Sequence, residues 1–343
     1  MKIRALGATL AASALVLSAT PVAQAQNAFL SSPGREVPNV NWELALDPNT
    51  YTNPTPIERE ILPDNLVAFG DSIMANPTYG DAAMNQVTGE EVRDIVRTLN
   101  NNITPQGCAQ GTPNTADEIG KNLGVPVNNY ACPAATLYTL EKNSLAGQVA
   151  AAVADGALNE STRYVVIQGG YNDIYSNYLR PTGEEGASIP GDEGTATQRD
   201  LFADAIDSLI AQVRASAPNA KISLLGYHTI TPDTPAGWQC IYHVGQGNGA
   251  ANVWNLTYAV PVAQNTQGER NTQKWLSEAA QRNGITFADV REFSKDHTEC
   301  TAPADRWVGG IILDTTSSGH NLALHLTDAG VYALSSEYAR QIA

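Results

Sequence analysis

The sequence predicts an α/β fold, in which a mostly parallel sheet carries helices on both faces. Short apolar runs typical of buried strands alternate along the chain with segments whose apolar residues repeat at helical spacing. Such alternation indicates a parallel sheet, because each return to the sheet needs a crossover helix. The exposed acidic loop over 181–197 does not end the alternation. We therefore expect one domain.

The predicted elements follow in chain order. Strands are expected at 66–69, 125–130, 164–168, 222–226 and 285–290, and helices at 90–99, 115–124, 137–158, 201–215, 272–283 and from Thr327 to the end. Thr115 opens a predicted capping box, and Gly124 is a predicted helix end. Between 233 and 262 the Gly, Asn and Gln content is high, so we expect a long excursion with little regular structure.

The composition argues against one class of partner. The chain has 35 Asp and Glu residues against 20 Lys and Arg, which is a formal net charge of −15. Binding to nucleic acid or to an anionic lipid surface relies on clustered Lys and Arg, and the sequence contains no such basic run. We expect no nucleic-acid partner.

The first 25 residues have the features of a secretory signal peptide. Lys2 and Arg4 precede an apolar stretch over 5–22, and a small-x-small pattern ends at Ala25. A membrane anchor is the weaker alternative, because Ser, Thr and Pro residues interrupt the stretch. We expect cleavage after Ala25, an irregular arm over 26–64 and one folded domain over 65–343. We expect the mature protein to be exported and to lack a membrane-spanning segment. We also expect it to be a monomer.

Four cysteines are consistent with export. Cys108, Cys132, Cys240 and Cys300 lack the C-x-x-C spacing of a zinc site or redox pair, and an even count in an exported protein indicates two disulfides. Three pairings are possible. We favour Cys108 with Cys132 and Cys240 with Cys300, because sequential pairing joins loops that a parallel sheet leaves on one edge.

Reactive or hydrogen-bonding groups follow three of the predicted strands. Ser72 comes after the first strand, Ala134 after the second and Asn172 after the third. The carboxyl ends of parallel strands meet at one edge of the sheet, where ligands bind. His325 lies just before the last predicted helix. A serine, a histidine and hydrogen-bond donors are the groups that acyl transfer needs, although each alone is also an ordinary cap, turn or surface residue.

Three motifs at these places resemble sequence blocks of the SGNH (GDSL-type) hydrolases. Phe69-Gly70-Asp71-Ser72 resembles the first block, Gly170-Tyr171-Asn172-Asp173 the Gly-x-Asn-Asp block, and His325-Leu326-Thr327 with Gly330 the histidine block. The resemblance extends from residue 65 to the carboxyl terminus. It implies a flavodoxin-like SGNH hydrolase fold.

The resemblance also implies roles. Ser72 is then the nucleophile, and His325 is the general base and later the general acid. Backbone N–H groups of Ser72 and Ala134 and the side-chain amide of Asn172 form the oxyanion hole. The sequence contains no phosphate loop and no dinucleotide fingerprint, so we expect no cofactor, and we expect no metal either. The export signal, the predicted disulfides and segment 297–308 are most similar to secreted actinobacterial lipases and esterases of this family.

Two positions depart from the family pattern. Ala134 stands where the second block usually has glycine, which leaves the N–H donor in place if the local φ suits alanine. Leu322 stands where an aspartate often precedes the histidine. We predict that the main-chain oxygen of Leu322 orients His325 instead. Catalysis then uses a dyad of Ser72 and His325. Asp314 and Asp328 are the alternative carboxylates.

The expected function is a secreted serine esterase or lipase that acts on a small-molecule or lipid ester through an acyl-enzyme. A deacetylase or acyl transferase working on envelope glycans or glycolipids would use the same residues. A non-catalytic binding module that keeps the fold is a third possibility, favoured by the missing aspartate. Other mechanisms fit less well: Met74 breaks a Gly-x-Ser-x-Gly elbow, and His320 with His325 lacks the helical spacing of zinc ligands.

Overall fold

The computed structural model describes residues 61–78, 104, 107–139, 144–174, 196–244, 256–310 and 322–343. The predicted signal peptide, the arm as far as residue 60 and the predicted helix over 90–99 lie outside these residues. No helix in the described ranges is long and apolar enough to cross a membrane.

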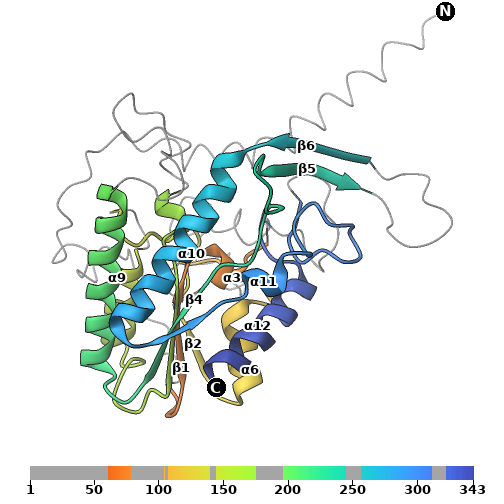
Figure 1. The fold of residues 1–343 in the computed structure, drawn as a ribbon. Coiled ribbons are helices and arrows are strands. Elements are labelled where there is room, and N and C mark those ends of the chain that lie inside the picture. Colours follow the sequence, from red (N-terminus) through yellow and green to blue (C-terminus); the bar gives the residue numbers. More distant parts are fainter. Residues whose placement is uncertain are drawn as a thin grey trace, which may run out of the picture.

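A five-stranded parallel sheet forms the centre of the molecule (Figure 1). Its strands lie in the order β2 (Val127–Asn129), β1 (Leu66–Gly70), β3 (Tyr164–Gln168), β4 (Lys221–Leu225) and β7 (Thr286–Ala288), and every neighbouring pair is parallel. Both faces of β1 and β3 are buried, which explains their continuous apolar sequences. The predicted parallel α/β fold is confirmed, and its strand order is the flavodoxin-like one.

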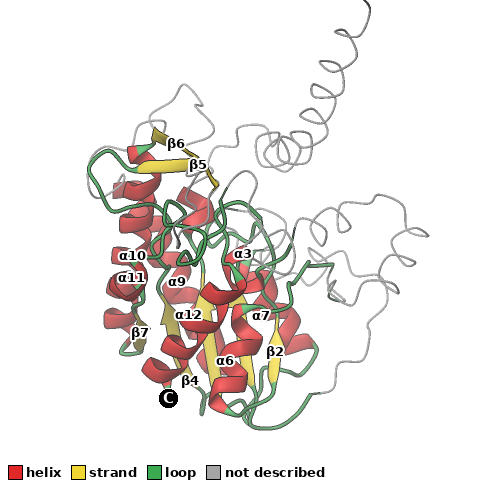
Figure 2. Ribbon diagram, turned by 90° about the vertical axis from the view of Figure 1, so that its right-hand side faces the viewer, coloured by secondary structure: helices red, strands yellow, loops and turns green. Residues whose placement is uncertain are grey.

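Helices cover both faces of the sheet. One face carries α6 (Thr115–Leu123) and α12 (Asp328–Ile342), which pack against each other. The other carries α7 (Leu145–Ala154), α9 (Ala196–Ser216) and α10 (Ala263–Asn283). Figure 1 shows α9 and α10 on the left of the strands and α6 and α12 on the right, and Figure 2 views α6 and α12 from the front.

Two of the predicted helix boundaries agree closely with the structure. Gly124 ends α6 at a φ of 67°, and Thr327 begins α12 by accepting a hydrogen bond from the Gly330 N–H. The N-cap of α6 is Asn114, whose side chain accepts from the Asp117 N–H, so the predicted capping box at Thr115 was misplaced by one residue. Asparagine caps a helix at least as well as threonine does.

The predicted helix over 137–158 is too long at its amino-terminal end. In the structure α7 begins at Leu145, with Ser144 as its N-cap. The N–H groups of residues 137–139 bind the carboxylate of Asp173 instead, so they do not start a helix.

The expectation of little regular structure over 233–262 was wrong. Strands β5 (Trp238–Val244) and β6 (Leu256–Pro261) form an antiparallel pair, and α10 begins at Ala263 instead of residue 272. The pair lies above the sheet in Figure 1, at the same end as the short helix α3 (Ser72–Ala75). The glycine- and asparagine-rich stretch that suggested an irregular excursion lies at 245–255, outside the described residues.

Two disulfides link loops at this end of the molecule. Cys108 is bonded to Cys132, and Cys240 of β5 is bonded to Cys300. These are the two pairs that the sequence favoured. The second disulfide attaches the β5–β6 pair to the segment that follows the helix α11 (Arg291–Ser294).

Candidate active site

Ser72 is the first residue of α3, directly after β1. The side chain of Asp71 caps this helix by accepting from the Ile73 N–H at 2.9 Å. A Cβ atom on Gly70 would lie 2.7 Å from the Met74 Cβ, so the sharp turn requires glycine there. Ser72 is partly exposed, whereas Asp71 and Ile73 are buried, so the turn presents the serine at the carboxyl edge of the sheet.

A buried glutamine holds the residue at which this turn begins. Gln148 of α7 accepts from the Gly70 N–H with Oε1 and donates to the Gly70 carbonyl with Nε2, both at 2.8 Å. Its amide thus gives the Gly70 N–H its acceptor and adds a donor to the Gly70 carbonyl. Sequence reasoning did not find this contact. The available signal was a single polar residue on the apolar face of an alanine-rich helix, at a position with no exposure to solvent.

Ala134 lies in the turn that follows β2 and has a φ of 62°. Glycine adopts this left-handed backbone without strain, and alanine does not. The residue is partly exposed, and its backbone N–H remains a hydrogen-bond donor. The alanine is therefore tolerated here in a strained conformation.

Asn172 follows β3 and contacts the Ala134 turn. Its Nδ2 donates to the carbonyl of Ala135 at 2.8 Å, and an amide group has a second N–H to offer. The buried carboxylate of Asp173 accepts from the N–H groups of Leu137, Tyr138 and Thr139 at 2.7 to 3.0 Å. Burial raises the pKa of Asp173 to about 6, although these hydrogen bonds act to lower the pKa. The ends of β2 and β3 are therefore joined beside Asn172.

His325 lies in the loop before α12. Its Nδ1 is 2.7 Å from the carbonyl oxygen of Ala323, so Nδ1 carries the proton that this oxygen accepts. The prediction that the main-chain oxygen of Leu322 orients His325 was wrong by one residue, because the oxygen of Ala323 lies at Nδ1. The Leu322 oxygen accepts instead from the backbone N–H of His325 at 3.2 Å, and Leu324, at a φ of 67°, turns the chain between them.

The other ring nitrogen of His325 is the one that would take a proton from serine. Nε2 is buried and forms no hydrogen bond with any described residue, Ser72 included. Burial lowers the pKa of His325 well below its usual value, although the Ala323 carbonyl opposes this shift. At neutral pH the imidazole is therefore uncharged, which is the form that a general base needs.

The loop of His325 is fixed by main-chain contacts. Gly309 donates its N–H to the His325 carbonyl at 2.6 Å and accepts from the Leu324 N–H at 3.0 Å. An isolated antiparallel bridge joins Val308 to Leu326. Of the two alternative carboxylates, Asp328 lies in the first turn of α12, where it interacts favourably with the helix dipole. Asp314 lies outside the described residues.

The continuation of β4 brings a second histidine to this region. His228 is fully buried, and neither ring nitrogen bonds to a described residue. Its pKa is lowered to about 3, mainly by burial and further by the nearby charges of His325 and Arg291. Sequence reasoning gave His228 no role.

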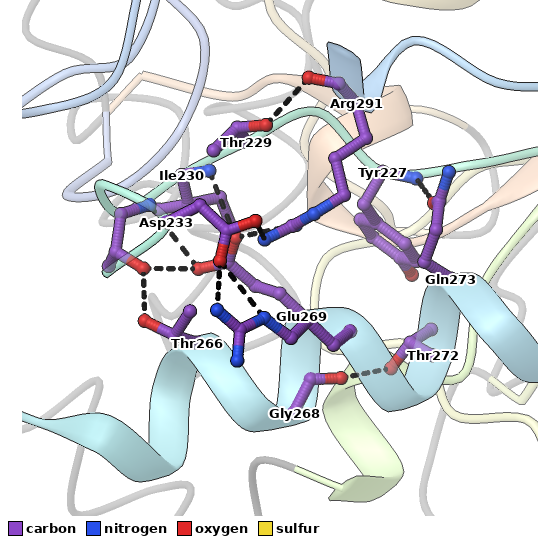
Figure 3. Close-up of polar contacts among 12 residues, drawn as sticks. Tyr227, Thr229, Ile230, Asp233, Thr266, Gly268, Glu269, Thr272, Gln273 and Arg291 are labelled. Carbon is purple, nitrogen blue, oxygen red and sulfur yellow. Dashed lines mark hydrogen bonds and ion pairs between the residues drawn. The ribbon is translucent and has the colours of Figure 1, made fainter. Parts of the chain in front are cut away.

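A polar network fixes the segment after His228 (Figure 3). The buried carboxylate of Glu269 accepts from the Ile230 and Thr231 N–H groups and from the Thr231 hydroxyl, and it pairs with Arg291 Nη1 at 3.0 Å. Arg291 also lies 3.6 Å from Asp233. The network thus holds this strand end against α10 and α11. Within the described ranges, no group of three His, Cys, Asp or Glu residues could hold a metal ion.

One protein family and one individual protein are similar to this chain in sequence. The profile of the GDSL-like Lipase/Acylhydrolase family matches residues 68–333. Lipase 2 of Streptomyces coelicolor is 26% identical over 227 residues, which are 63% of this chain and 70% of that protein.

Two solved structures are also similar to this chain. The phospholipase A1 of Streptomyces albidoflavus NA297 has a TM-score of 0.47 and 17% identity, over 82% of this chain and 100% of that one. The extracellular lipase of Streptomyces rimosus has a TM-score of 0.45 and 15% identity, over 81% and 99%. Because the family profile covers most of the sequence, from within β1 to within α12, the chain belongs to the GDSL-like lipase/acylhydrolase family.

Proposed function

We propose that the chain is a serine esterase or lipase that hydrolyses carboxylic esters through an acyl-enzyme on Ser72. The observation that carries this proposal is the hydrogen bond between His325 Nδ1 and the Ala323 carbonyl. It fixes the neutral tautomer whose Nε2 is a proton acceptor. A partly exposed serine at the carboxyl end of β1 and membership of the family add support.

In the proposed mechanism, His325 Nε2 takes the proton of Ser72 as the hydroxyl oxygen attacks the ester carbonyl. The N–H groups of Ser72 and Ala134 and the side-chain amide of Asn172 stabilise the oxyanion. The imidazolium then protonates the leaving alcohol, and water repeats the sequence to release the acid. A carbonyl orients the histidine but stabilises its charged form less than a carboxylate does, so we expect modest turnover.

A fluorophosphonate probe tests the nucleophile. The probe should label the wild type and the variant Ser208→Ala, which changes a partly buried serine of α9, but not Ser72→Ala. Equal labelling of Ser72→Ala would contradict the assignment. Absence of labelling in the folded wild type would favour a binding module, which also fits the finding that a main-chain carbonyl, and no carboxylate of the described residues, lies at His325 Nδ1.

The variant Asn172→Ala tests the oxyanion hole. Because the amide would bond to charge that develops only in the transition state, kcat should fall by about a hundredfold with little change in KM. Hydrolysis kinetics and a melting curve measure both properties. A folded variant with wild-type kcat would leave Asn172 as a turn residue that holds the Ala135 carbonyl.

We also propose that the protein is exported and that residues 1–25 are removed. Two disulfides support this, because such bonds persist in oxidising compartments. A hydrolysis screen over acyl chain lengths, with alcohol and glycan acceptors added, tests the substrate and separates hydrolysis from acyl transfer.

A further inference from the structure

The side chain of Tyr227 contacts the residues that directly precede Ser72 and Asn172. Tyr227 follows β4 and is fully buried. Its Oη donates to a carboxylate oxygen of Asp71, and the phenol lies close to the backbone of Tyr171. The rings of Tyr227 and Tyr171 also pack together, with centroids 5.7 Å apart. Tyr227 thus bridges the turn at Ser72, through its hydroxyl, and the Asn172 segment, through its ring.

The carboxylate at one end of this bridge has few other partners. Asp71 accepts from the Ile73 N–H with its second oxygen, and no described Lys or Arg forms an ion pair with it. Burial and the nearby Asp173 carboxylate both disfavour its charge. The phenol is therefore a main support for the charged form of Asp71, and its loss would weaken the cap of α3.

The main chain that carries Tyr227 is held by several elements. Its N–H donates to Oε1 of Gln273 on α10 at 3.1 Å (Figure 3). The carbonyl of Gly226 accepts from the Tyr338 hydroxyl of α12 at 2.5 Å and from Gln168 Nε2 of β3 at 3.1 Å. A Cβ atom on Gly226 would lie 2.6 Å from Gln273 Oε1, so glycine permits this approach. Tyr227 is thus a rigid reference point for the two segments it bridges.

We propose that Tyr227 is a positioning residue of the reaction: its hydroxyl binds Asp71 while its ring packs on Tyr171, and the two contacts together set the distance between the Ser72 nucleophile and the Asn172 amide. This inference rests on the function proposed above. The oxyanion forms between those two groups, so a small change in their separation weakens bonds made in the transition state. Binding of the substrate depends less on that separation. The structure therefore assigns to Tyr227 an effect on kcat with little effect on KM.

The variant Tyr227→Phe keeps the ring, and with it the contact with Tyr171, and removes the hydroxyl that binds Asp71. We expect kcat for a short-chain p-nitrophenyl ester to fall by about tenfold to a hundredfold, while KM changes by less than about twofold. The matched control is Tyr130→Phe, because the Tyr130 hydroxyl also donates to a carboxylate, that of Asp155 at 2.9 Å, at the far end of α7. The control should keep wild-type kcat. Wild-type kcat in folded Tyr227→Phe would overturn the inference.

A second variant tests the bridge from its other end. Asp71→Asn keeps a good N-cap but presents an NH2 group in place of one oxygen. It should lower kcat, and the double variant with Tyr227→Phe should lose no more than the larger single loss, because both changes break one bond. Wild-type kcat in Asp71→Asn would contradict the inference even if Tyr227→Phe does not fold, and additive losses in a folded double variant would contradict it as well.

The outcome for Ser72 separates this inference from the proposed function. If Ser72→Ala keeps hydrolysing the ester, the proposed function fails and the inference fails with it. If hydrolysis depends on Ser72 and Tyr227→Phe is fully active, only the role of Tyr227 is wrong.

Discussion

The turn that carries Ser72, the proposed nucleophile (residues 70–73, the nucleophile turn), and the loop before α12 that carries His325 (the histidine loop) are supported in different ways. Around Ser72 the support comes from side chains of other elements, namely Gln148 on Gly70 and Tyr227 on Asp71. Around His325 it comes from the main chain, through the carbonyl of Ala323 and the backbone of Gly309. A single substitution can remove a side-chain support, whereas it leaves main-chain bonds in place. Substitutions away from the reacting groups should therefore disturb the serine side more than the histidine side.

The variant Gln148→Met removes both bonds to Gly70 and should have the largest effect on stability. The Gly70 N–H would be buried without a partner, which costs about 1 to 3 kcal/mol in the free energy of unfolding. The Gly70 carbonyl still accepts from the Cys132 N–H at 3.0 Å. We expect kcat to fall as well, because the turn at Ser72 begins at this residue.

Urea denaturation and ester hydrolysis measure these losses. The control Gln212→Met changes a glutamine on α9 whose bond to Ser208 is long, at 3.5 Å, and should change neither property. Unchanged stability in Gln148→Met would refute the side-chain support of the nucleophile turn.

The histidine side should be more sensitive to pH than to substitution. Glu299 lies on segment 297–309, is buried, and accepts from the Cys240 N–H at 3.1 Å. Its pKa is raised to about 9, mainly by burial and further by the nearby Glu269. The folded chain therefore keeps a proton that the unfolded chain releases, so this contribution to stability is lost as pH rises from about 4.5 to about 9.

The variant Glu299→Gln removes that titration. At pH 8 it should be more stable than the wild type by about 1 to 3 kcal/mol, and the difference should shrink toward pH 5. Chemical denaturation at both pH values measures it, with the exposed Glu160→Gln as control. An equal difference in stability between the variant and the wild type at both pH values would contradict the raised pKa of Glu299.

The smallest expected change in stability comes from a substitution at Ala134. The left-handed backbone there strains alanine by about 1 kcal/mol, which glycine relieves. Ala134→Gly should raise the free energy of unfolding by about 0.5 to 1 kcal/mol and keep kcat, because the N–H donor is unchanged. A decrease in stability on calorimetry would indicate that the methyl group makes contacts worth more than the strain.

The same difference in support explains what could be predicted from sequence. Strands β1 and β3, the cap at Thr327 and the cysteine pairs depend on local patterns or simple counting. The contacts that hold the nucleophile turn join residues 78 and 156 positions apart, so no local pattern reveals them. The β5–β6 pair was missed because turn-forming composition outweighed the strand pattern on either side of it.

The prediction for the histidine was close because it concerned backbone geometry. A carbonyl does orient His325, but the left-handed Leu324 makes it that of Ala323. Such a φ is uncommon for leucine, so sequence alone favours the neighbouring residue.

The most direct test of the account compares three variants in one hydrolysis assay: His325→Ala, Asp328→Asn and Asp314→Asn. If the Ala323 carbonyl alone orients the imidazole, His325→Ala should lose nearly all activity, and both aspartate variants should keep most of their kcat. Loss of about four orders of magnitude in kcat on changing either aspartate, as in a triad that loses its carboxylate, would contradict the main-chain support of the histidine.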